Sequence, residues 1–230
     1  MSEWWTYHLS NFLLFSARTY YRLFEIYNAA IWPAQIPAIA AGVAIPALLR
    51  GGTAASRALG RAICVILAAC WLFVAVAFHA KRYASINTFG IPIAWAFGIE
   101  AALLIGIGVV AGRLTFAWPA GLAGRVGLAI FLFALVVQPL VGLLLGRSWR
   151  QIELFGVSPD PTAVATLGVL LTARVRRRWL LMTIPVVWCA VAGLTLLAMK
   201  APDFWVTPLA AVVAASSSFV KTRPATEPAP

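Results

Sequence analysis

Long apolar stretches separated by short polar or basic connections make up most of the chain from about residue 29 onward. A bilayer core of about 30 Å is crossed by a helix of about 20 apolar residues. The pattern predicts an all-α, polytopic transmembrane helix bundle, formed by a single domain over residues 1–220. The predicted membrane helices cover residues 29–49, 62–79, 88–112, 126–146, 161–173, 179–199 and 204–220.

The fifth stretch, residues 161–173, is the shortest, because 13 residues give only about 20 Å of helix. Such a helix crosses a bilayer only where the membrane is thinned or where neighbouring helices shield it. The alternative is a re-entrant segment, which leaves six crossings.

An amphipathic helix is predicted ahead of the first apolar stretch, over residues 16–28, with Ser16 as its N-cap. Aromatic and aliphatic side chains recur there at helical spacing and charged ones take another face. We expect this helix to lie in the outer membrane interface. The Pro-rich tail, residues 221–230, is predicted to be disordered.

The composition supports a lipid environment. Hydrophobic residues make up 62% of the chain and charged residues only 11%, whereas soluble domains carry about 25% charged residues. The net charge of +11 does not indicate a nucleic-acid partner, because the basic residues sit at the ends of apolar runs. Residues in those positions orient helices and contact lipid headgroups. We expect membrane lipid as a partner and no nucleic acid.

The basic residues also predict an orientation. The odd-numbered connections and the tail hold eleven of the Lys and Arg residues, and the even-numbered connections hold five. Cytoplasmic loops are enriched in Lys and Arg. We therefore predict seven crossings with the N-terminus outside and the C-terminus inside. A re-entrant fifth segment would place the cluster Arg174–Arg178 on the opposite side.

Two polar residues inside the apolar stretches are candidates for an ion or proton path. Glu100 sits near the middle of the third stretch, where a carboxylate costs several kcal/mol unless it is protonated, paired or hydrated. It is a candidate proton or cation site on an internal cavity, or else a neutral acid that joins two helices. Gln138, in the fourth stretch, is a further candidate for the same path.

A second group of polar residues collects at the predicted outer side, where it forms either one outward-facing pocket or a solvated interface. His79 with nearby carboxylates has the ligand types of a divalent metal site, but the spacing matches no compact metal motif. No cofactor is predicted. Asp160 and Pro161 together indicate a helix N-cap followed by its first residue. The group comprises Glu25, Asn28, Gln35, His79, Tyr83, Asn87, Glu153 and Asp160.

Three stretches carry a resemblance to a known family: Tyr20–Asn28, Ala77–Asn87 and Glu153–Thr162. With them the chain resembles a family of uncharacterised multi-pass bacterial membrane proteins, described only as a domain of unknown function. The resemblance implies a location in the bacterial inner membrane and supplies no activity or catalytic residue.

The sequence leaves several functions open. A small permease, channel or transport accessory would open outward at the polar group and reach Glu100 at mid-depth. A non-transporting subunit or scaffold of a larger respiratory or redox complex is the alternative, and it predicts a membrane-protein partner; a homo-oligomer is also open. An intramembrane enzyme is the least favoured function, since the chain has no HExxH or GxSxG motif.

Overall fold

A computed structural model describes residues 15–51, 56–119, 121–175 and 178–219, and it is 77% helical. The predicted tail, residues 221–230, lies outside this part. Nine α-helices are described: α1 (Ala17–Ala30), α2 (Gln35–Gly51), α3 (Arg57–Phe73), α4 (Gly90–Leu103), α5 (Leu122–Leu132), α6 (Gln138–Leu144), α7 (Pro159–Thr172), α8 (Arg178–Ala198) and α9 (Val206–Ser218).

Short π- and 3₁₀-helical segments extend or connect these helices. Three π-helical segments continue α3, α4 and α5 without a break, and two 3₁₀ turns lie in connections. π-Helical turns within α-helices are often found at functional sites. The segments are η3 (Val74–Ala80), η5 (Leu104–Val110), η6 (Phe133–Val137), η4 (Tyr83–Ser85) and η7 (Trp149–Gln151).

The helices bear out an all-α bundle suited to a membrane. Within the described residues, four continuous helical segments are long and apolar enough to cross a bilayer, and a fifth is added if α1 and α2 form one span. Those two helices are bent by 92°. The bend explains why α2 begins at Gln35 and not at Ala29: α1 continues to Ala30 and a turn intervenes.

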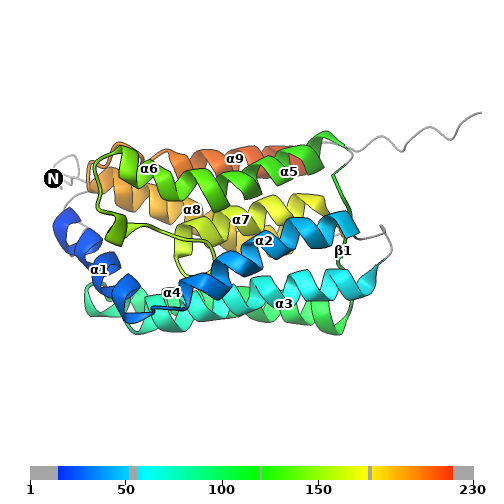
Figure 1. Ribbon diagram of the computed structural model, residues 1–230, viewed down its shortest axis with the longest axis horizontal. Helices are drawn as coiled ribbons and strands as arrows, with labels where there is room; N and C mark the ends of the chain where they lie inside the picture. Colours follow the sequence, from blue (N-terminus) through cyan, green and yellow to red (C-terminus); the bar gives the residue numbers. More distant parts are fainter. Residues whose placement is uncertain (1–14, 52–55, 120, 176–177, 220–230) are drawn as a thin grey trace, which may run out of the picture.

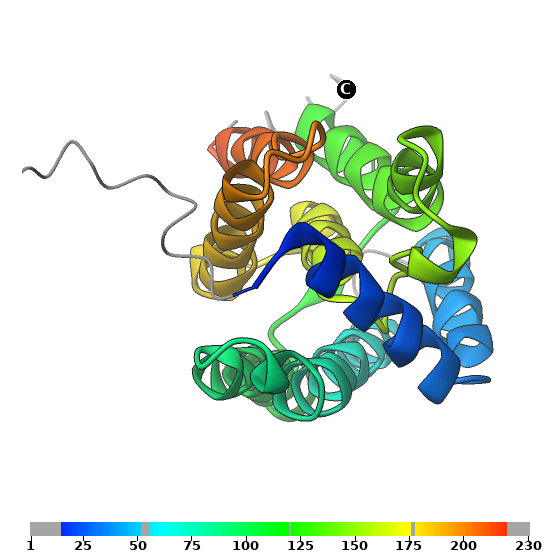
Figure 2. The ribbon, with the colours of Figure 1, turned by 90° about the vertical axis from the view of Figure 1, so that its left-hand side faces the viewer.

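α1 has the predicted local structure. Ser16 is its N-cap, and the Ser16 hydroxyl accepts a hydrogen bond from the backbone N–H of Thr19 at 3.2 Å. Tyr20, Phe24 and Tyr27 are buried along one face. The helix therefore presents an aromatic face to the bundle, and Figure 2 shows it crossing one end of the other helices.

α7 lies at the centre of the bundle, with the other helices around it (Figures 1 and 2). All fourteen of its residues are buried. A helix that faces protein on every side does not have to match the thickness of the lipid, which accounts for its short length. Its N-cap is Ser158, so the expectation that Asp160 caps this helix is wrong. Asp160 lies inside the first turn, because the helix begins at Pro159.

Three aromatic side chains fasten α7 and the turn before it to three other helices. The Tyr27 hydroxyl donates to the carbonyl of Val157 at 2.6 Å. The indole N–H of Trp71 donates to Thr166 Oγ1 at 2.8 Å, and that of Trp188 donates to Asp160 Oδ1 at 2.9 Å. These bonds satisfy polar groups in an otherwise apolar interior.

From α2 onward, successive helical segments run in opposite directions along the long axis, with α5, η6 and α6 forming one segment, so their connections gather at two ends (Figure 1). At one end, the strands β1 (Thr115–Phe116) and β2 (Ala173–Arg174) pair antiparallel. The guanidinium of Arg50 lies there over the ring of Trp118, 4.7 Å from its centroid. The first, third and fifth connections thus meet at this end, and α1 lies at the other.

Candidate functional site

The structure distributes the ten candidate residues over three neighbouring places. Glu25, Asn28 and Gln35 line a groove beside α1. His79, Tyr83, Asn87 and Asp160 lie in the bundle close to the start of α7, and Glu100 lies deeper on α4. Gln138 and Glu153 border a small crevice between α6 and η7. The single polar pocket predicted from the sequence is therefore divided in this structure.

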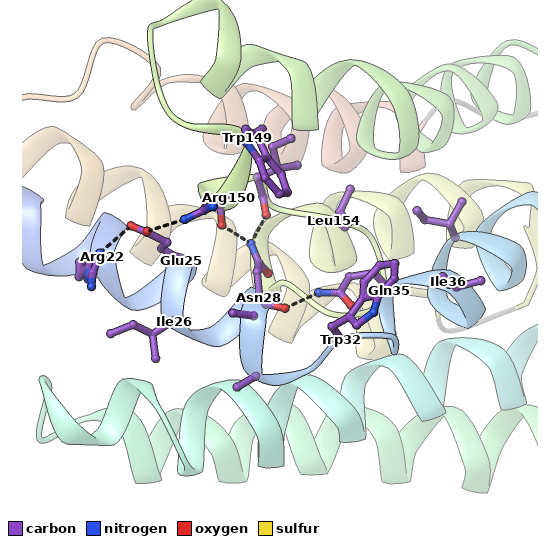
Figure 3. A pocket seen from close by; sticks show the side chains of 14 residues that line it. Arg22, Glu25, Ile26, Asn28, Trp32, Gln35, Ile36, Trp149, Arg150 and Leu154 are labelled. Atoms are coloured by element: carbon purple, nitrogen blue, oxygen red, sulfur yellow. Dashed lines mark hydrogen bonds and ion pairs between the residues drawn. The ribbon is translucent and has the colours of Figure 1, made fainter.

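The groove, which we call the α1–α2 groove, is formed by α1, the first turns of α2 and residues 149–154 (Figure 3). It has a volume of about 930 Å³. Charged side chains stand at one end, where Glu25 contacts Arg22 at 3.2 Å and Arg150 at 4.0 Å. Apolar side chains line most of the rest. Arg150 was not among the predicted site residues, although its place in a short polar connection was a visible signal.

Two amides form the floor of this groove. The Asn28 side-chain N–H₂ group donates to the carbonyls of Arg150 and Ile152, both at 2.9 Å. Gln35 Nε2 donates to the carbonyl of Asn28 at 2.8 Å. Asn28 Oδ1 and Gln35 Oε1 are buried and have no hydrogen-bond partner among the described residues. Two unused acceptor oxygens therefore lie buried beside the groove.

His79 is enclosed by aromatic rings. Its imidazole lies 4.4 Å from the ring of Phe97 and 4.9 Å from that of Trp188, measured between centroids. Tyr83 and Phe78 complete the surroundings at 5.8 Å and 5.1 Å. The side chain is fully buried, and neither ring nitrogen has a partner among the described residues.

The neighbours of His79 link it to two other candidates. Asn87 donates to the Tyr83 hydroxyl at 2.8 Å, and Trp188, which stacks edge-on against His79, holds Asp160. His79, Tyr83 and Asp160 therefore lie near one another inside the bundle, and the half-buried Asn87 borders them, whereas the sequence placed all four at an outward-facing surface. Sequence reasoning missed Trp188 and Phe97, which look like ordinary apolar residues of their helices.

Glu100 is completely buried on α4, and neither carboxyl oxygen has a hydrogen-bond partner among the described residues. Phe97 precedes it by three residues and is buried on the same helix face. Because Phe97 contacts His79, Glu100 lies about one helical turn, or about 5 Å along the axis, deeper than the imidazole cluster. For the interpretation of Glu100 as an acid that hydrogen-bonds to another helix, the described part of the chain supplies no partner.

The crevice between α6 and η7 brings Gln138 and Glu153 together with Arg147. Arg147 forms an ion pair with Asp203, and its guanidinium lies 4.5 Å from the ring centroid of Tyr21. Burial and the nearby Asp160 carboxylate raise the pKa of Glu153 well above its ordinary value. The pair of Arg147 and Asp203 joins two connections that the sequence gave no reason to place together.

The described residues contain no group of three or more His, Cys, Asp and Glu side chains able to hold a metal ion. Glu25 lies in the groove, while His79 is enclosed by rings. The metal site considered from the sequence, His79 with Glu25, Glu153 or Asp160, is therefore not assembled in the part of the chain that the structure describes.

A family model described as "Family of unknown function (DUF6064)" matches residues 17–227. The chain belongs to the DUF6064 family. No curated protein and no solved structure matches the sequence. The match to DUF6064 confirms the family resemblance and brings no activity with it, so the function of this DUF6064 chain has to be argued from its own residues.

Proposed function

We propose that this DUF6064 protein is a small proton-linked permease of the bacterial inner membrane, with seven crossings and an outward-facing pocket. The alternating direction of α2 to α9 supports seven passes, with α5 and α6 forming one of them. The basic first, third and fifth connections share one end, and Lys and Arg favour the cytoplasmic side. The α1–α2 groove then faces outward and serves as the entrance.

The observation that carries proton linkage is that two buried ionisable groups, His79 and Glu100, have no hydrogen-bond partner among the residues that the structure describes. An ionisable side chain inside a membrane bundle is costly and marks ion or proton pathways by default. A purely structural acid or imidazole would be expected to use its hydrogen-bonding groups, since an unsatisfied buried polar group costs about 1–3 kcal/mol. The polar atoms of His79 and Glu100 instead have no hydrogen-bond partner among the described residues.

The groove and the buried pair are separated here by packed rings. Phe78 lies between His79 and the α1 side chains Phe24 and Tyr27, at 5.0–5.2 Å between ring centroids. Under the proposal this is the closed arrangement, and transport requires these contacts to open. The His79 and Asp160 side chains are then the first polar groups that a solute from the groove would meet.

The test is proton uptake by liposomes that contain the purified full chain and a pH-sensitive dye. A potassium diffusion potential, negative inside, drives proton entry. We expect the wild-type protein to acidify the lumen faster than protein-free liposomes do, and Glu100→Gln to reduce the rate to that background. Glu227→Gln is the matched control: it removes a carboxylate from the end of the sequence and should leave the rate unchanged.

Two results would contradict the proposal. One is a wild-type rate equal to that of protein-free liposomes. The other is an unchanged rate in Glu100→Gln, provided that the variant has the same helical circular dichroism and elutes as a single species in detergent. Absence of proton uptake together with a stoichiometric polypeptide in native mass spectra would favour the alternative, a non-transporting subunit.

A further inference from the structure

The polarity of the α1–α2 groove changes along its length. Arg22, Glu25 and Arg150 lie together at the α1 end, and the remaining lining is mainly apolar (Figure 3). On the α2 side, Ile36 and Ile39 line the groove and are 56% and 43% exposed. Val43, one turn further along α2, is 60% exposed. The groove thus continues from a charged end onto an apolar stripe of a membrane helix.

This arrangement fits an amphiphile better than a compact solute. Its volume of about 930 Å³ is near the upper end of ordinary ligand pockets, and apolar side chains dominate the lining. A molecule with a charged head and a hydrocarbon chain places the head beside the arginines and the chain along α2. The exposed indoles of Trp32 and Trp149 border the groove, as expected for residues at the level of lipid headgroups.

The polar groups specify the head. Two arginines beside one glutamate provide donors for a phosphate and one carboxylate acceptor for a cation. The amide donors of Asn28 and Gln35 are committed to backbone carbonyls, which fixes the orientation of both amides. Their oxygens are left as buried acceptors, and Gln35 is only 8% exposed. A ligand with N–H donors next to its phosphate satisfies these groups.

We propose that the α1–α2 groove binds one phospholipid with a primary-amine headgroup. The phosphate pairs with Arg22 and Arg150, the ammonium donates to Glu25 and Asn28, and an acyl chain follows Ile36 and Ile39 along α2. This inference rests on the proposed function in one respect: it takes the α1–α2 groove as the entrance of the permease and names the class of molecule that enters there. Binding itself requires neither His79 nor Glu100.

The experiment is lipid binding to the delipidated full chain in mild detergent, followed by native mass spectrometry. Phosphatidylethanolamine is titrated against phosphatidylcholine, which has the same phosphate and charge but no N–H donors. We expect one phosphatidylethanolamine adduct, with an affinity about tenfold above that for phosphatidylcholine, as for a hydrogen bond to a charged group. Glu25→Gln should remove the preference, and Arg150→Gln should weaken binding of both lipids.

Arg174→Gln is the matched control, since it removes an exposed arginine from β2, which pairs with β1 at the other end of the bundle, and should leave the adduct unchanged. Equal affinity for the two lipids, or an unchanged adduct in both groove variants, would overturn the proposal. Displacement of the lipid by inorganic phosphate at the same concentration would also overturn it, because the groove would then be an anion site. So would a polypeptide that is found bound in the groove. Glu100→Gln should still bind phosphatidylethanolamine. Loss of proton uptake in this variant is therefore distinguishable from loss of lipid binding.

Discussion

Glu153 lies in the connection between α6 and α7, and its Oε2 atom is buried without a hydrogen-bond partner among the described residues. Burial raises its pKa, and the negative charge of Asp160 acts in the same direction. Arg147 opposes this rise, because its positive charge favours the ionised form. The carboxyl group is therefore more easily protonated in the folded protein than in the unfolded chain.

This difference predicts how stability changes with pH. The contribution from Glu153 is fully present below the unfolded-state pKa of about 4.3 and is lost as the pH rises toward the raised pKa of the folded state. We expect Glu153→Gln to flatten the fall in unfolding temperature above about pH 4.3, measured by differential scanning fluorimetry in detergent. Glu25→Gln, in the ion pair with the exposed Arg22, serves as the control. Parallel profiles for Glu153→Gln and the wild type would contradict this assignment.

At the scale of the helix, the backbones of α5 and α7 lie close together at Gly127 and Gly168. A Cβ atom at Gly168 would lie 2.6 Å from the Gly127 carbonyl oxygen and from the Phe131 nitrogen. A Cβ atom at Gly127 would lie 2.5 Å from the Gly168 carbonyl oxygen. The obstacles are backbone atoms, which a side-chain rotation does not move. The two glycines therefore set the distance between these helices, as small residues do in membrane bundles.

We expect Gly168→Ala to destabilise the protein by about 1–3 kcal/mol, the usual cost of an extra methyl group in a packed interior. Gly98→Ala is the matched control, because nothing lies within 4 Å of a Cβ atom there. In a helix that exchange is favourable by roughly 0.8–1.0 kcal/mol. Unfolding in a mixed-detergent titration checks both variants. Equal stability of Gly168→Ala and the wild type would show that α5 and α7 can separate without cost.

At the scale of the molecule, the connections at the two ends differ in charge, and this difference predicts which end faces the cytoplasm. Ser85 lies exposed at the α1 end and Arg113 lies exposed at the β1 end. The native cysteines, Cys64, Cys70 and Cys189, are buried. Single new cysteines at the two exposed positions therefore report on the two ends separately.

We expect a membrane-impermeant maleimide to label Ser85→Cys in intact spheroplasts and to label Arg113→Cys only after the membrane is permeabilised. The readout is the mass shift of the purified protein, and the wild type under both conditions is the control for the native cysteines. Labelling of both positions in intact spheroplasts would contradict a membrane-spanning arrangement of the two ends. The reverse order would place the groove on the cytoplasmic side.

Much of the candidate site could be named from the sequence, but its division could not. Glu100 and His79 stand out as ionisable residues in or beside apolar runs, and a local rule is enough to select them. The aromatic residues that surround His79, such as Trp188 and Phe97, carry no such signal, since they read as ordinary members of an apolar helix. Which of them meet His79 depends on the packing of α4 and α8 against η3.

Apart from the bend between α1 and α2, the sequence by itself determined which segments are helical and which connections carry the positive charge, because hydropathy, capping at Ser16 and charge are properties of short segments. Only the tertiary structure decided that α7 is buried on every side, that Gly127 meets Gly168, and that the candidate residues fall into a groove, an aromatic enclosure and a crevice. The physical reason is that lipid tails are as apolar as a protein core. The pattern of apolar residues therefore does not distinguish a helix face that meets lipid from one that meets another helix.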